Sequence, residues 1–506
     1  MIFKAITDLS SKADKTYFKE KIDIYIKTVE ALCKKYSVEL IEHPKEDECV
    51  LHIIKMGLIK KKEDMPLLKG VLKKNFYDLF LCAIATEINY SESLSPFMGN
   101  LNNSYRKNLQ QSERKKKKIN LVDLFCGAGG LSLGFTQEGY NTVFANDFDE
   151  LCIETYKYNH PELSTDKIVC GDIRNIAYTI DQLIEEDVDI VIGGPPCQGF
   201  SSANKRHRVI DDPRNELYKY YLEAVEKLAP KIVVMENVKG MLKVANQVVE
   251  DYAAIKVMCD GKEYSYQVAY QLLNSADFSV AQSRERLIYI AIRDDIAEKY
   301  SVTPADIFNQ IETSNKGKPR YNLSAAIEGV RSLEPPHMMN VGELDTEEAG
   351  RKIDVNPFVG KENPYLTLIN CNREMALVYN HKARYCSEVN HEIYRRLNQG
   401  DDATDPKIAD IMPYAHRNDK FKDKYYKLYA DRPCRTITAH LRSDCHSHIH
   451  PTEARTLTPR EAARVQSFPD DYLFLGPYLK TYIQIGNAVP VVMAREIAKI
   501  LKKYLS

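Results

Sequence analysis

The residues best suited to covalent chemistry surround a single cysteine. An apolar run at 189–193 leads into Gly194-Pro195-Pro196-Cys197-Gln198-Gly199-Phe200, so the Cys197 thiol lies on a rigid turn after a predicted strand. In an open α/β sheet, ligands collect outside the carboxyl ends of the strands, where such a thiol can meet a substrate. A free cysteine is more often a small buried hydrophobe. Cys197 is therefore a candidate nucleophile whose role depends on its neighbours.

A carboxylate and two guanidinium groups are expected at the same edge of the sheet. The apolar run at 231–236 ends in Glu236, and Gln282-Ser283-Arg284-Glu285-Arg286 comes before another apolar run. A glutamate that closes a buried strand is unfavourable unless it is paired or used. A thiol, a carboxylate that can carry a proton, and the Arg284 and Arg286 side chains together suit covalent attack on an electron-poor heterocycle. The structural alternative is a salt bridge between Glu236 and one of the arginines.

A glycine-rich junction predicts a nucleoside cofactor. The first strand of the sheet ends in Phe125-Cys126-Gly127-Ala128-Gly129-Gly130, where glycines let a cofactor lie against the backbone at a helix N-terminus. Asp147 follows the second strand and can accept hydrogen bonds from ribose hydroxyls, and Asp172 follows the third, where it can meet the base. Ser132 replaces the third glycine of the dinucleotide fingerprint, which makes a pyrophosphate cofactor less favoured. The alternative is a tight turn with ordinary surface carboxylates.

The elements that would carry these residues alternate between strands and helices. Several runs are almost entirely apolar, as expected of parallel strands that are covered on both faces. An amphipathic stretch at 217–228 has the spacing of a crossover helix, so we predict a doubly wound α/β domain. The predicted strands are 120–125, 142–146, 167–170, 189–193, 231–236 and 286–292, the later helices are 459–466 and 491–504, and 482–489 is predicted as loop or strand.

Length and periodicity predict several domains. At about 150 residues per domain, a chain of 506 residues should form two to four. Helical spacing early in the chain and a basic run before residue 119 indicate a mostly helical extension with a linker. Regular patterning fades after about residue 300, which suggests an inserted recognition region. The predicted segments are 1–118 for the extension, 119–300 for the core, 301–455 for the insert and 456–506 for a segment that completes the core.

Composition narrows the class of protein. Hydrophobic residues make up 44% and charged residues 28% of the chain, as in globular proteins. We find no apolar run of membrane-spanning length and no secretory signal in 1–21, so we expect a cytoplasmic protein. Twelve cysteines without a Cys-x-x-Cys pair predict reduced thiols, and the Cys434, Cys445, His446, His448 and His450 group fits no zinc spacing, so we expect no metal. A net charge of −1 neither favours nor excludes DNA.

Taken together, the motifs resemble those of the DNA cytosine-C5 methyltransferases. The resemblance covers 119–300 and 431–506 and leaves the first 118 residues outside. It implies a Rossmann-like core that uses S-adenosylmethionine, with an inserted target-recognition domain. The matching segments are Asp123-Leu124-Phe125-Cys126-Gly127-Ala128-Gly129-Gly130, Asn146-Asp147-Phe148-Asp149, Gly171-Asp172-Ile173, Pro195-Pro196-Cys197-Gln198, Glu236-Asn237-Val238, Gln282-Ser283-Arg284-Glu285-Arg286, Arg435-Thr436-Ile437-Thr438, 457–469 and Gln484-Ile485-Gly486-Asn487-Ala488-Val489-Pro490.

The resemblance implies a role for each catalytic residue. The Cys197 thiolate would add to C6 of cytosine, because C5 alone is too weak a nucleophile to take a methyl group. Glu236 would donate a proton at N3, and Arg284 and Arg286 would bind O2 of the base. The cytosine must leave the duplex, so base flipping is implied.

The resemblance also implies a cofactor pocket. Phe125 and the loop at 127–130 would border the methionine part, Asp147 the ribose, Phe148 the adenine face and Asp172 the adenine amine. Many relatives have tryptophan where this chain has Phe148, and phenylalanine can still stack. The full predicted set is Phe125, Cys126, Gly127, Ala128, Gly129, Gly130, Asp147, Phe148, Asp172, Ile173, Gly194, Pro196, Leu217, Asn487 and Val489.

DNA is the expected macromolecular partner. The loop after the nucleophile resembles a mobile segment that closes over flipped DNA and contacts phosphates. The region at 301–430 should enter the major groove, where base edges are distinguishable. Within it, His381, Arg384, Arg395 and Arg396 are either reading residues or structural ones. The predicted DNA-contacting residues of the loop are Gln198, Ser201, Ser202, Lys205, Arg206 and Arg208.

Three alternatives remain open at this point. An RNA cytosine methyltransferase shares most motifs, but its Cys-Phe-Thr tripeptide is absent here and its insert is shorter. A nicotinamide dehydrogenase would leave the Pro195–Gln198 and Glu236–Val238 segments unexplained. The third is a non-catalytic DNA-binding regulator on the same fold. By analogy, we expect a monomeric bacterial or phage modification enzyme, paired in function with a restriction endonuclease that it need not contact.

Overall fold

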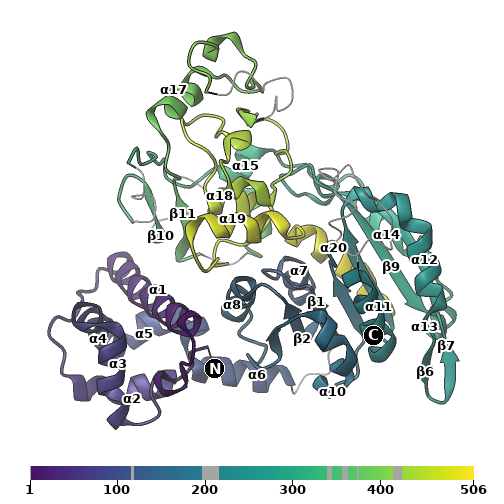
Figure 1. Ribbon diagram of the computed structural model, residues 1–506, viewed down its shortest axis with the longest axis horizontal. Helices are drawn as coiled ribbons and strands as arrows, with labels where there is room; N and C mark the ends of the chain where they lie inside the picture. The colour runs from purple at the N-terminus through teal and green to yellow at the C-terminus, as the bar shows by residue number, and fades with distance from the viewer. Residues whose placement is uncertain are drawn as a thin grey trace.

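The computed structural model describes residues 2–114, 119–196, 216–338, 345–355, 363–372, 375–413 and 424–505. Figure 1 shows three parts: a helical N-terminal lobe, a central α/β core and an upper lobe. We use "N-terminal lobe" for 2–114, "core" for 119–320 with 488–505, and "upper lobe" for the described part of 321–487. The last helix leaves the upper lobe and returns to the core, so the core is discontinuous in sequence (Figure 1).

Helix α1, the longest of the N-terminal lobe, shows why this segment is helical. Ser11 and Asp14 form a reciprocal capping box at its start, which satisfies two backbone N–H groups. Ser37 ends it in a left-handed conformation. Of the predicted apolar stripe, Ile22, Ile26, Val29 and Cys33 are buried, whereas Tyr36 at the end of the helix is 39% exposed. The segment is helical, as this spacing predicted. The helices of this lobe are α1 (Lys12–Tyr36), α2 (Glu46–Met56), α3 (Met65–Leu72), α4 (Lys74–Asn89), α5 (Ser91–Leu94) and α6 (Asn103–Arg114).

The core contains a seven-stranded sheet in the order β3-β2-β1-β4-β5-β9-β8. Its first five strands are parallel, whereas β9 runs antiparallel to both β5 and β8. Every predicted strand is present, with ends that differ by one residue. Strand β8 was missed because it lies at the sheet edge and buries little beyond its ends. The strands are β1 (Asn120–Leu124), β2 (Asn141–Asp147), β3 (Ile168–Cys170), β4 (Ile190–Gly193), β5 (Ile232–Asn237), β8 (Tyr266–Asn274) and β9 (Glu285–Arg293), with β6 (Val257–Cys259) and β7 (Lys262–Tyr264) forming a separate hairpin.

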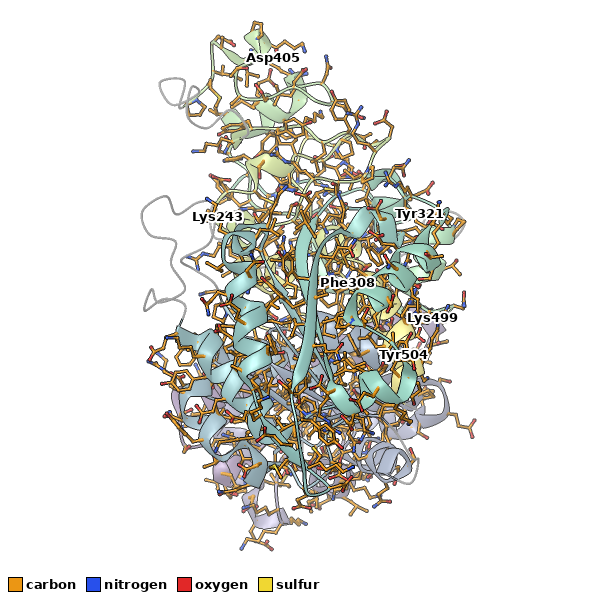
Figure 2. All side chains as sticks on the ribbon, turned by 90° about the vertical axis from the view of Figure 1, so that its right-hand side faces the viewer. Lys243, Phe308, Tyr321, Asp405, Lys499 and Tyr504 are labelled. Carbon is orange, nitrogen blue, oxygen red and sulfur yellow. The ribbon has the colours of Figure 1, made fainter. Side chains whose placement is uncertain are left out.

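Helices cover both faces of this sheet, as a doubly wound fold requires. Alternate residues of β1 belong to different apolar clusters: Leu121 packs with α7, α14 and α20, and Val122 packs with α9 to α12. The face that Leu121 shares with α14 is also held by a 2.6 Å hydrogen bond, which Gln310 of α14 donates to the Tyr504 hydroxyl. Figure 2 labels Phe308 of α14 and Tyr504. The core helices are α7 (Gly130–Gln137), α8 (Glu150–Asn159), α9 (Ile173–Ile176), α10 (Ile180–Leu183), α11 (Glu216–Leu228), α12 (Ala245–Ala254), α13 (Asp294–Tyr300), α14 (Pro304–Asn315) and α20 (Val491–Leu501).

The upper lobe contains the one element whose type the sequence mispredicted. Residues 482–489 were expected as loop or strand, but Tyr478–Asn487 is helix α19. This segment is rich in aromatic and β-branched residues, which favour strands. Tertiary packing overrides that preference, because Thr481, Tyr482 and Ile485 are buried on one helical face. The other elements are α15 (Leu323–Ile327), β10 (Gly350–Val355), α16 (Pro364–Ile369), β11 (Leu377–Lys382), α17 (Glu388–Arg396) and α18 (Pro459–Val465).

Buried arginines hold the upper lobe together around α18. Arg464 forms a two-bond pair with Asp470 at 2.7 and 2.9 Å, and Arg455 forms one with Glu461 at 2.8 and 2.7 Å. Burial alone would raise the pKa of Asp470, but the Arg464 and Arg460 charges outweigh it and hold that pKa below its ordinary value. Buried ions are tolerated when they are paired and hydrogen-bonded in this way.

Replacing Asp470 by asparagine should destabilise the protein. The Asp470→Asn side chain keeps its shape but leaves the Arg464 guanidinium buried without a counter-charge, which should lower the free energy of unfolding by about 3–5 kcal/mol. Urea unfolding followed by circular dichroism measures this. Glu347→Gln, which breaks an exposed pair with Arg351, is the matched control and should change nothing measurable. Equal effects from both variants would contradict the assignment.

Candidate functional site

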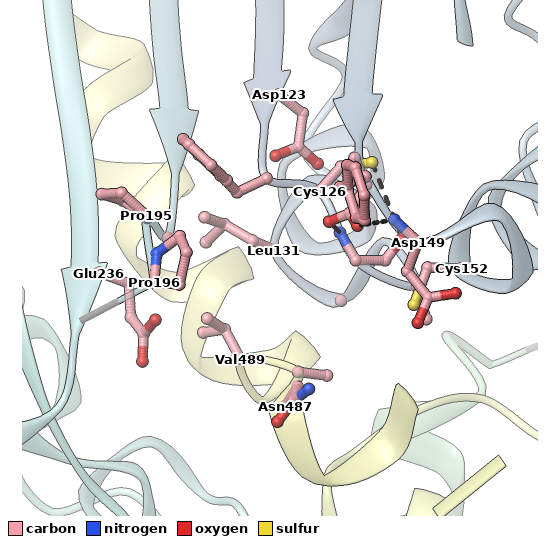
Figure 3. Close-up of a pocket in the computed structure, with 18 of the residues that line it drawn as sticks. Asp123, Cys126, Leu131, Asp149, Cys152, Pro195, Pro196, Glu236, Asn487 and Val489 are labelled. Atoms are coloured by element: carbon pink, nitrogen blue, oxygen red, sulfur yellow. Dashed lines mark hydrogen bonds between the residues drawn. The ribbon is translucent and has the colours of Figure 1, made fainter. Parts of the chain in front are cut away.

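A cavity of about 670 Å³ opens at the carboxyl edge of the sheet, within the range of small-molecule sites. In Figure 3, Glu236 lies on β5, Pro196 lies in the turn after β4, and the carboxyl-terminal segment brings Asn487 and Val489 to the same space. The cavity therefore joins segments that are far apart in sequence. The predicted residues that line it are Phe125, Cys126, Gly127, Ala128, Gly130, Asp147, Phe148, Asp172, Ile173, Gly194, Pro196, Leu217, Glu236, Arg284, Arg286, Asn487 and Val489.

The glycine loop after β1 leaves room for a ligand. Gly127 has a φ of +53°, and a Cβ there would meet no atom within 4 Å, so its backbone borders open space. Gly129 differs from the prediction because it does not line the cavity. Its φ is +88°, and a Cβ would approach the His160 ring and the Tyr472 hydroxyl to 2.8 Å. We interpret Gly129 as the residue that lets the loop turn into α7.

The end of β2 is organised by the Asp147 carboxylate. Its two oxygens accept 2.8 Å hydrogen bonds from the backbone N–H groups of Gly127 and Asp149, so Asp147 ties the glycine loop to the start of α8. Burial raises its pKa, although these N–H groups oppose the shift. The next residue, Phe148, leaves 75% of its surface exposed while bordering the cavity. An exposed aromatic ring in this position can stack on a flat ligand.

Asp172 follows β3, beside the turn after β2, and already has a partner. Its carboxylate accepts from the Arg174 backbone at 3.0 Å, which caps α9, and forms an ion pair with the Arg174 guanidinium at 2.6 Å. Both residues line the cavity. The Arg174 hydrogen bond and charge, opposed by burial, lower the pKa of Asp172, so this carboxylate stays ionised at neutral pH.

Asp123 is a cavity residue that the sequence reasoning did not single out. It is 1% exposed, and neither carboxylate oxygen has a hydrogen-bond partner within the described residues. Burial raises its pKa to about 8, against a smaller opposing effect of Ser132. A positively charged ligand group would favour its ionised form. The signal was present in the sequence, because an aspartate within an apolar strand is as unfavourable as Glu236 at the end of β5.

The catalytic candidates of β5 and β9 meet at one side of the cavity. Arg286 Nε lies 2.7 Å from Glu236 Oε1, and both side chains are mostly buried. The salt bridge that the sequence left open therefore exists, but it borders the cavity and so does not exclude a catalytic role. Asn237 donates a 3.0 Å hydrogen bond to the Pro195 carbonyl, which anchors the proline turn to β5. That turn leads directly to Cys197 in the chain.

Arg284 differs from Arg286 in what it contacts. It is 1% exposed, and its two Nη groups donate to the carbonyls of Ile437 at 2.6 Å and Gly486 at 2.9 Å. These bonds are to protein backbone, so we interpret Arg284 as a positioning residue, in place of the base-binding role expected for it. Its neighbour Gln282 has the same function, since it accepts from Ile437 N and donates to Gln466 Oε1, both at 2.7 Å.

Other predicted residues lie outside this site. Cys197 and the loop residues Gln198, Ser201, Ser202, Lys205, Arg206 and Arg208 fall outside the described residues. In the upper lobe, His381 is buried between Thr458 and the Arg331 carbonyl, and Arg384 donates to the carbonyls of Leu441 and Ser443. Arg395 and Arg396 both pair with Glu392. These contacts favour structural roles for all four.

The cysteines in the described ranges are all free thiols, as expected. The same ranges contain no cluster of three or more His, Cys, Asp or Glu side chains placed to hold a metal ion. Within them, no helix has both the length and the apolar character needed to cross a membrane.

Fold and cavity together define a class of protein. The parallel strands follow the 3-2-1-4-5 order of doubly wound nucleotide-binding sheets, and the ligand cavity lies at their carboxyl edge. One half of the cavity has the glycine loop, the Asp147 carboxylate and the exposed Phe148 ring, and the other half has the Glu236–Arg286 pair. A fold and cavity of this kind are typical of enzymes that bind a nucleoside-type cofactor beside a second reactant.

Comparison with known proteins identifies the family. The family model for C-5 cytosine-specific DNA methylases matches residues 119–503. The type II methyltransferase M.DdeI of Desulfomicrobium norvegicum is 31% identical over 76% of this chain and 89% of its own length, and M.AgeI of Thalassovita gelatinovora is 30% identical over 76% and 99%. The chain belongs to the C-5 cytosine-specific DNA methylase family, whose members are DNA cytosine-5 methyltransferases.

A solved structure supports the fold independently. A crystal structure described as that of a prophage-encoded DNA modification methyltransferase from E. coli has a TM-score of 0.55 and 23% sequence identity. The similarity covers 77% of this chain and 99% of that one. The Rossmann-like fold expected from the sequence is therefore confirmed.

The exposed ring of Phe148 should contribute to cofactor binding. Phe148→Ala should weaken binding of S-adenosylhomocysteine by about 1–3 kcal/mol, because a stacked base loses its aromatic partner. Isothermal titration calorimetry measures the loss. Phe148→Trp keeps a stacking surface and should bind about as well as the unchanged protein. If alanine and tryptophan variants bind alike, Phe148 does not contact the adenine.

Proposed function

We propose that this enzyme transfers a methyl group from S-adenosylmethionine to C5 of a cytosine that is flipped out of a specific DNA duplex, through a covalent bond between Cys197 and C6. The observation that carries the proposal is the single cavity shared by the cofactor residues and the Glu236–Arg286 pair. The similarity of this chain to proteins named as type II methyltransferases suggests that the enzyme is the modification half of a restriction-modification pair. A cognate endonuclease would be its functional partner without physical contact.

The residues present fit S-adenosylmethionine. The orphaned carboxylate of Asp123 suits a cationic group, the open backbone at Gly127 suits a close approach, and the Phe148 ring suits a purine. Asp147 and Asp172 would face the ribose and the base. When bound there, the cofactor supplies an electrophilic methyl group. Asn487 and Val489 close the cavity from the carboxyl-terminal segment.

Residues of β5 and β9 would activate the cytosine. The Cys197 thiolate forms a bond to C6 while N3 takes a proton from Glu236, and C5 thereby becomes nucleophilic enough to accept the methyl group. Loss of the C5 proton, breakage of the C6–S bond and return of the N3 proton to Glu236 then release the methylated base and restore both the thiolate and the Glu236 carboxyl group. Arg286 holds Glu236 Oε1 at 2.7 Å, and Glu236 Oε2 lies beside Gly194, where a Cβ would approach it to 3.1 Å.

We expect the residues just before Cys197 to set the position of its thiol. Pro195 and Pro196 restrict the backbone just before Cys197, and the Asn237 amide fixes the Pro195 carbonyl to β5. Glu236 lies on the same strand, beside Asn237, so β5 positions the proposed proton donor and also anchors the turn at Pro195 and Pro196. The upper lobe would supply the contacts to base edges, and flipping would bring one cytosine into the cavity.

The central experiment is methylation of a random-sequence duplex library, read by bisulfite sequencing. We expect C5-methylcytosine at one short sequence, and its loss with Cys197→Ala and Cys197→Ser, because neither side chain provides a thiolate. A duplex with 5-fluorocytosine should trap a complex that survives denaturation, since fluorine cannot leave as a proton does. Methylation of tRNA in place of DNA would overturn the substrate, and activity of Cys197→Ala would overturn the covalent step.

Glu236 should act in the chemical step. Glu236→Gln cannot donate the same proton, so kcat should fall by about 10²- to 10⁴-fold while cofactor affinity is kept. Glu285→Gln is the matched control, because Glu285 lies on β9 beside Arg286 but pairs with exposed Lys239 at 2.9 Å. Single-turnover methylation at saturating DNA and cofactor separates the two. A Glu236→Gln enzyme with unchanged kcat would remove this carboxyl from the mechanism.

A further inference from the structure

The N-terminal lobe lies outside the segment that matches the family, yet it contacts both of the other lobes. The family match begins at residue 119. In Figure 1, α1 lies beside β10 of the upper lobe, and α6 runs beneath the core. A segment that contacts two lobes at once can fix their position relative to each other.

Towards the core, the N-terminal lobe docks on α8. Lys21 of α1 lies 2.5 Å from Glu154 Oε2, with both side chains about nine-tenths buried. Arg106 of α6 donates to the Lys157 carbonyl at 2.8 Å, and Gln110 donates to the Pro161 carbonyl at 3.0 Å. Helix α8 begins directly after Phe148, so the lobe holds the helix that follows the adenine-binding turn.

Towards the upper lobe, the same helix makes a second set of contacts. The Glu20 carboxylate accepts from Lys352 Nζ of β10 and from Gly476 N, both at 2.6 Å. Lys27 lies 3.0 Å from Asp345, and Lys35 donates to the Ala376 carbonyl at 3.3 Å. These partners lie in or next to the two-stranded β10–β11 sheet and in the segment before α19.

Apolar packing connects the same parts. One cluster of buried residues contains the apolar core of the N-terminal lobe. It also contains residues of the β10–β11 sheet, of the segment before α19 and of α8. Removing the whole lobe would expose these side chains to water, so substitutions test its role more cleanly than a deletion. The residues from outside the lobe are Tyr158, Ile353, Leu377, Tyr379, Leu473 and Leu475.

We infer that the N-terminal lobe is an intramolecular brace that sets the position of the upper lobe over the core, and with it the opening in which DNA binds. Adjacent residues of α1 carry the two halves of the connection: Glu20 binds the upper lobe and Lys21 binds the core. Mostly buried ion pairs add little net stability but enforce one geometry, which is the property that a brace needs. The inference rests on the proposed role of the upper lobe in DNA recognition.

The brace predicts a specific kinetic effect. With the upper lobe held in place, DNA binding does not have to order it, and loosening the brace would add that ordering to the free energy of binding. The KM for DNA should therefore rise, whereas kcat at saturating DNA should stay unchanged. A lobe that only stabilises the fold would act differently: its variants would lower the active fraction, and apparent kcat would fall at constant KM.

The test uses the full chain with Glu20→Gln combined with Lys352→Met. We expect KM for a duplex containing the methylated sequence to rise about 5- to 30-fold, with kcat and the S-adenosylhomocysteine affinity within twofold of the unchanged protein. Lys352→Arg with Glu20 unchanged keeps the ion pair, so its KM should equal that of the unchanged protein. Lys62→Met is the matched control, because it removes an ion pair with Asp47 that lies wholly within the N-terminal lobe.

Hydrogen exchange gives a readout that does not depend on activity. Without DNA, the Glu20→Gln, Lys352→Met protein should exchange faster at β10 and β11 than the unchanged protein does, while β1 and β4 stay equally protected. Unchanged exchange and unchanged KM would overturn the brace. Protection of exposed N-terminal amides by DNA, with a raised KM for Lys62→Met, would show direct DNA binding by the lobe and also overturn it. A wild-type protein that methylates no DNA would instead contradict the proposed function.

Discussion

The buried guanidinium of Arg284 connects two parts of the chain that are distant in sequence and that both border the cavity. It lies just before β9, inside the first half of the chain's methylase segment, and its hydrogen bonds end on Ile437 and Gly486. A buried guanidinium needs hydrogen-bond acceptors, and the two carbonyls supply them to both Nη groups, whereas Nε has no partner within the described residues. The same requirement places Asn487 and Val489 over the glycine loop. Without this interaction, the cavity would lack its carboxyl-terminal wall.

The same principle extends into the upper lobe. Arg460 donates to three backbone carbonyls in two segments, β11 and the stretch after α18, and the Arg455–Glu461 and Arg464–Asp470 pairs are almost completely buried. Apolar contacts alone are non-directional, whereas each of these bonds allows only one arrangement. We therefore see the upper lobe as a region with little regular structure whose shape is specified by buried polar interactions. The brace formed by the N-terminal lobe would specify its position in the same way.

The two functional halves of the cavity have different electrostatics. On the cofactor side, carboxylates predominate: Asp123, Asp147 and Asp172 suit a ligand with hydroxyl and cationic groups. On the base side, the Glu236 carboxylate is neutralised by Arg286, so a neutral heterocycle can approach without a strong field. This division matches a reaction between a cationic methyl donor and an uncharged base. It follows from the sheet topology: the parallel strands β1 to β5 point their carboxyl ends at this edge, and antiparallel β9 begins there, which places Arg286 beside Glu236.

Six of the seven core strands, the family and most of the cavity could be predicted from the sequence. Parallel strands are buried on both faces and read as continuous apolar runs, and residues such as Asp147 and Glu236 are conspicuous because they follow those runs directly. It also left Glu236 with two readings, a salt bridge or a proton donor, and the structure shows that the bridge borders the cavity. Three features became visible only in the tertiary structure: the helical state of α19, the hydrogen bonds of Arg284 to distant backbone carbonyls, and the docking of the N-terminal lobe through Glu20 and Lys21. Each of these depends on partners distant in sequence, and local residue preferences carry no information about such partners.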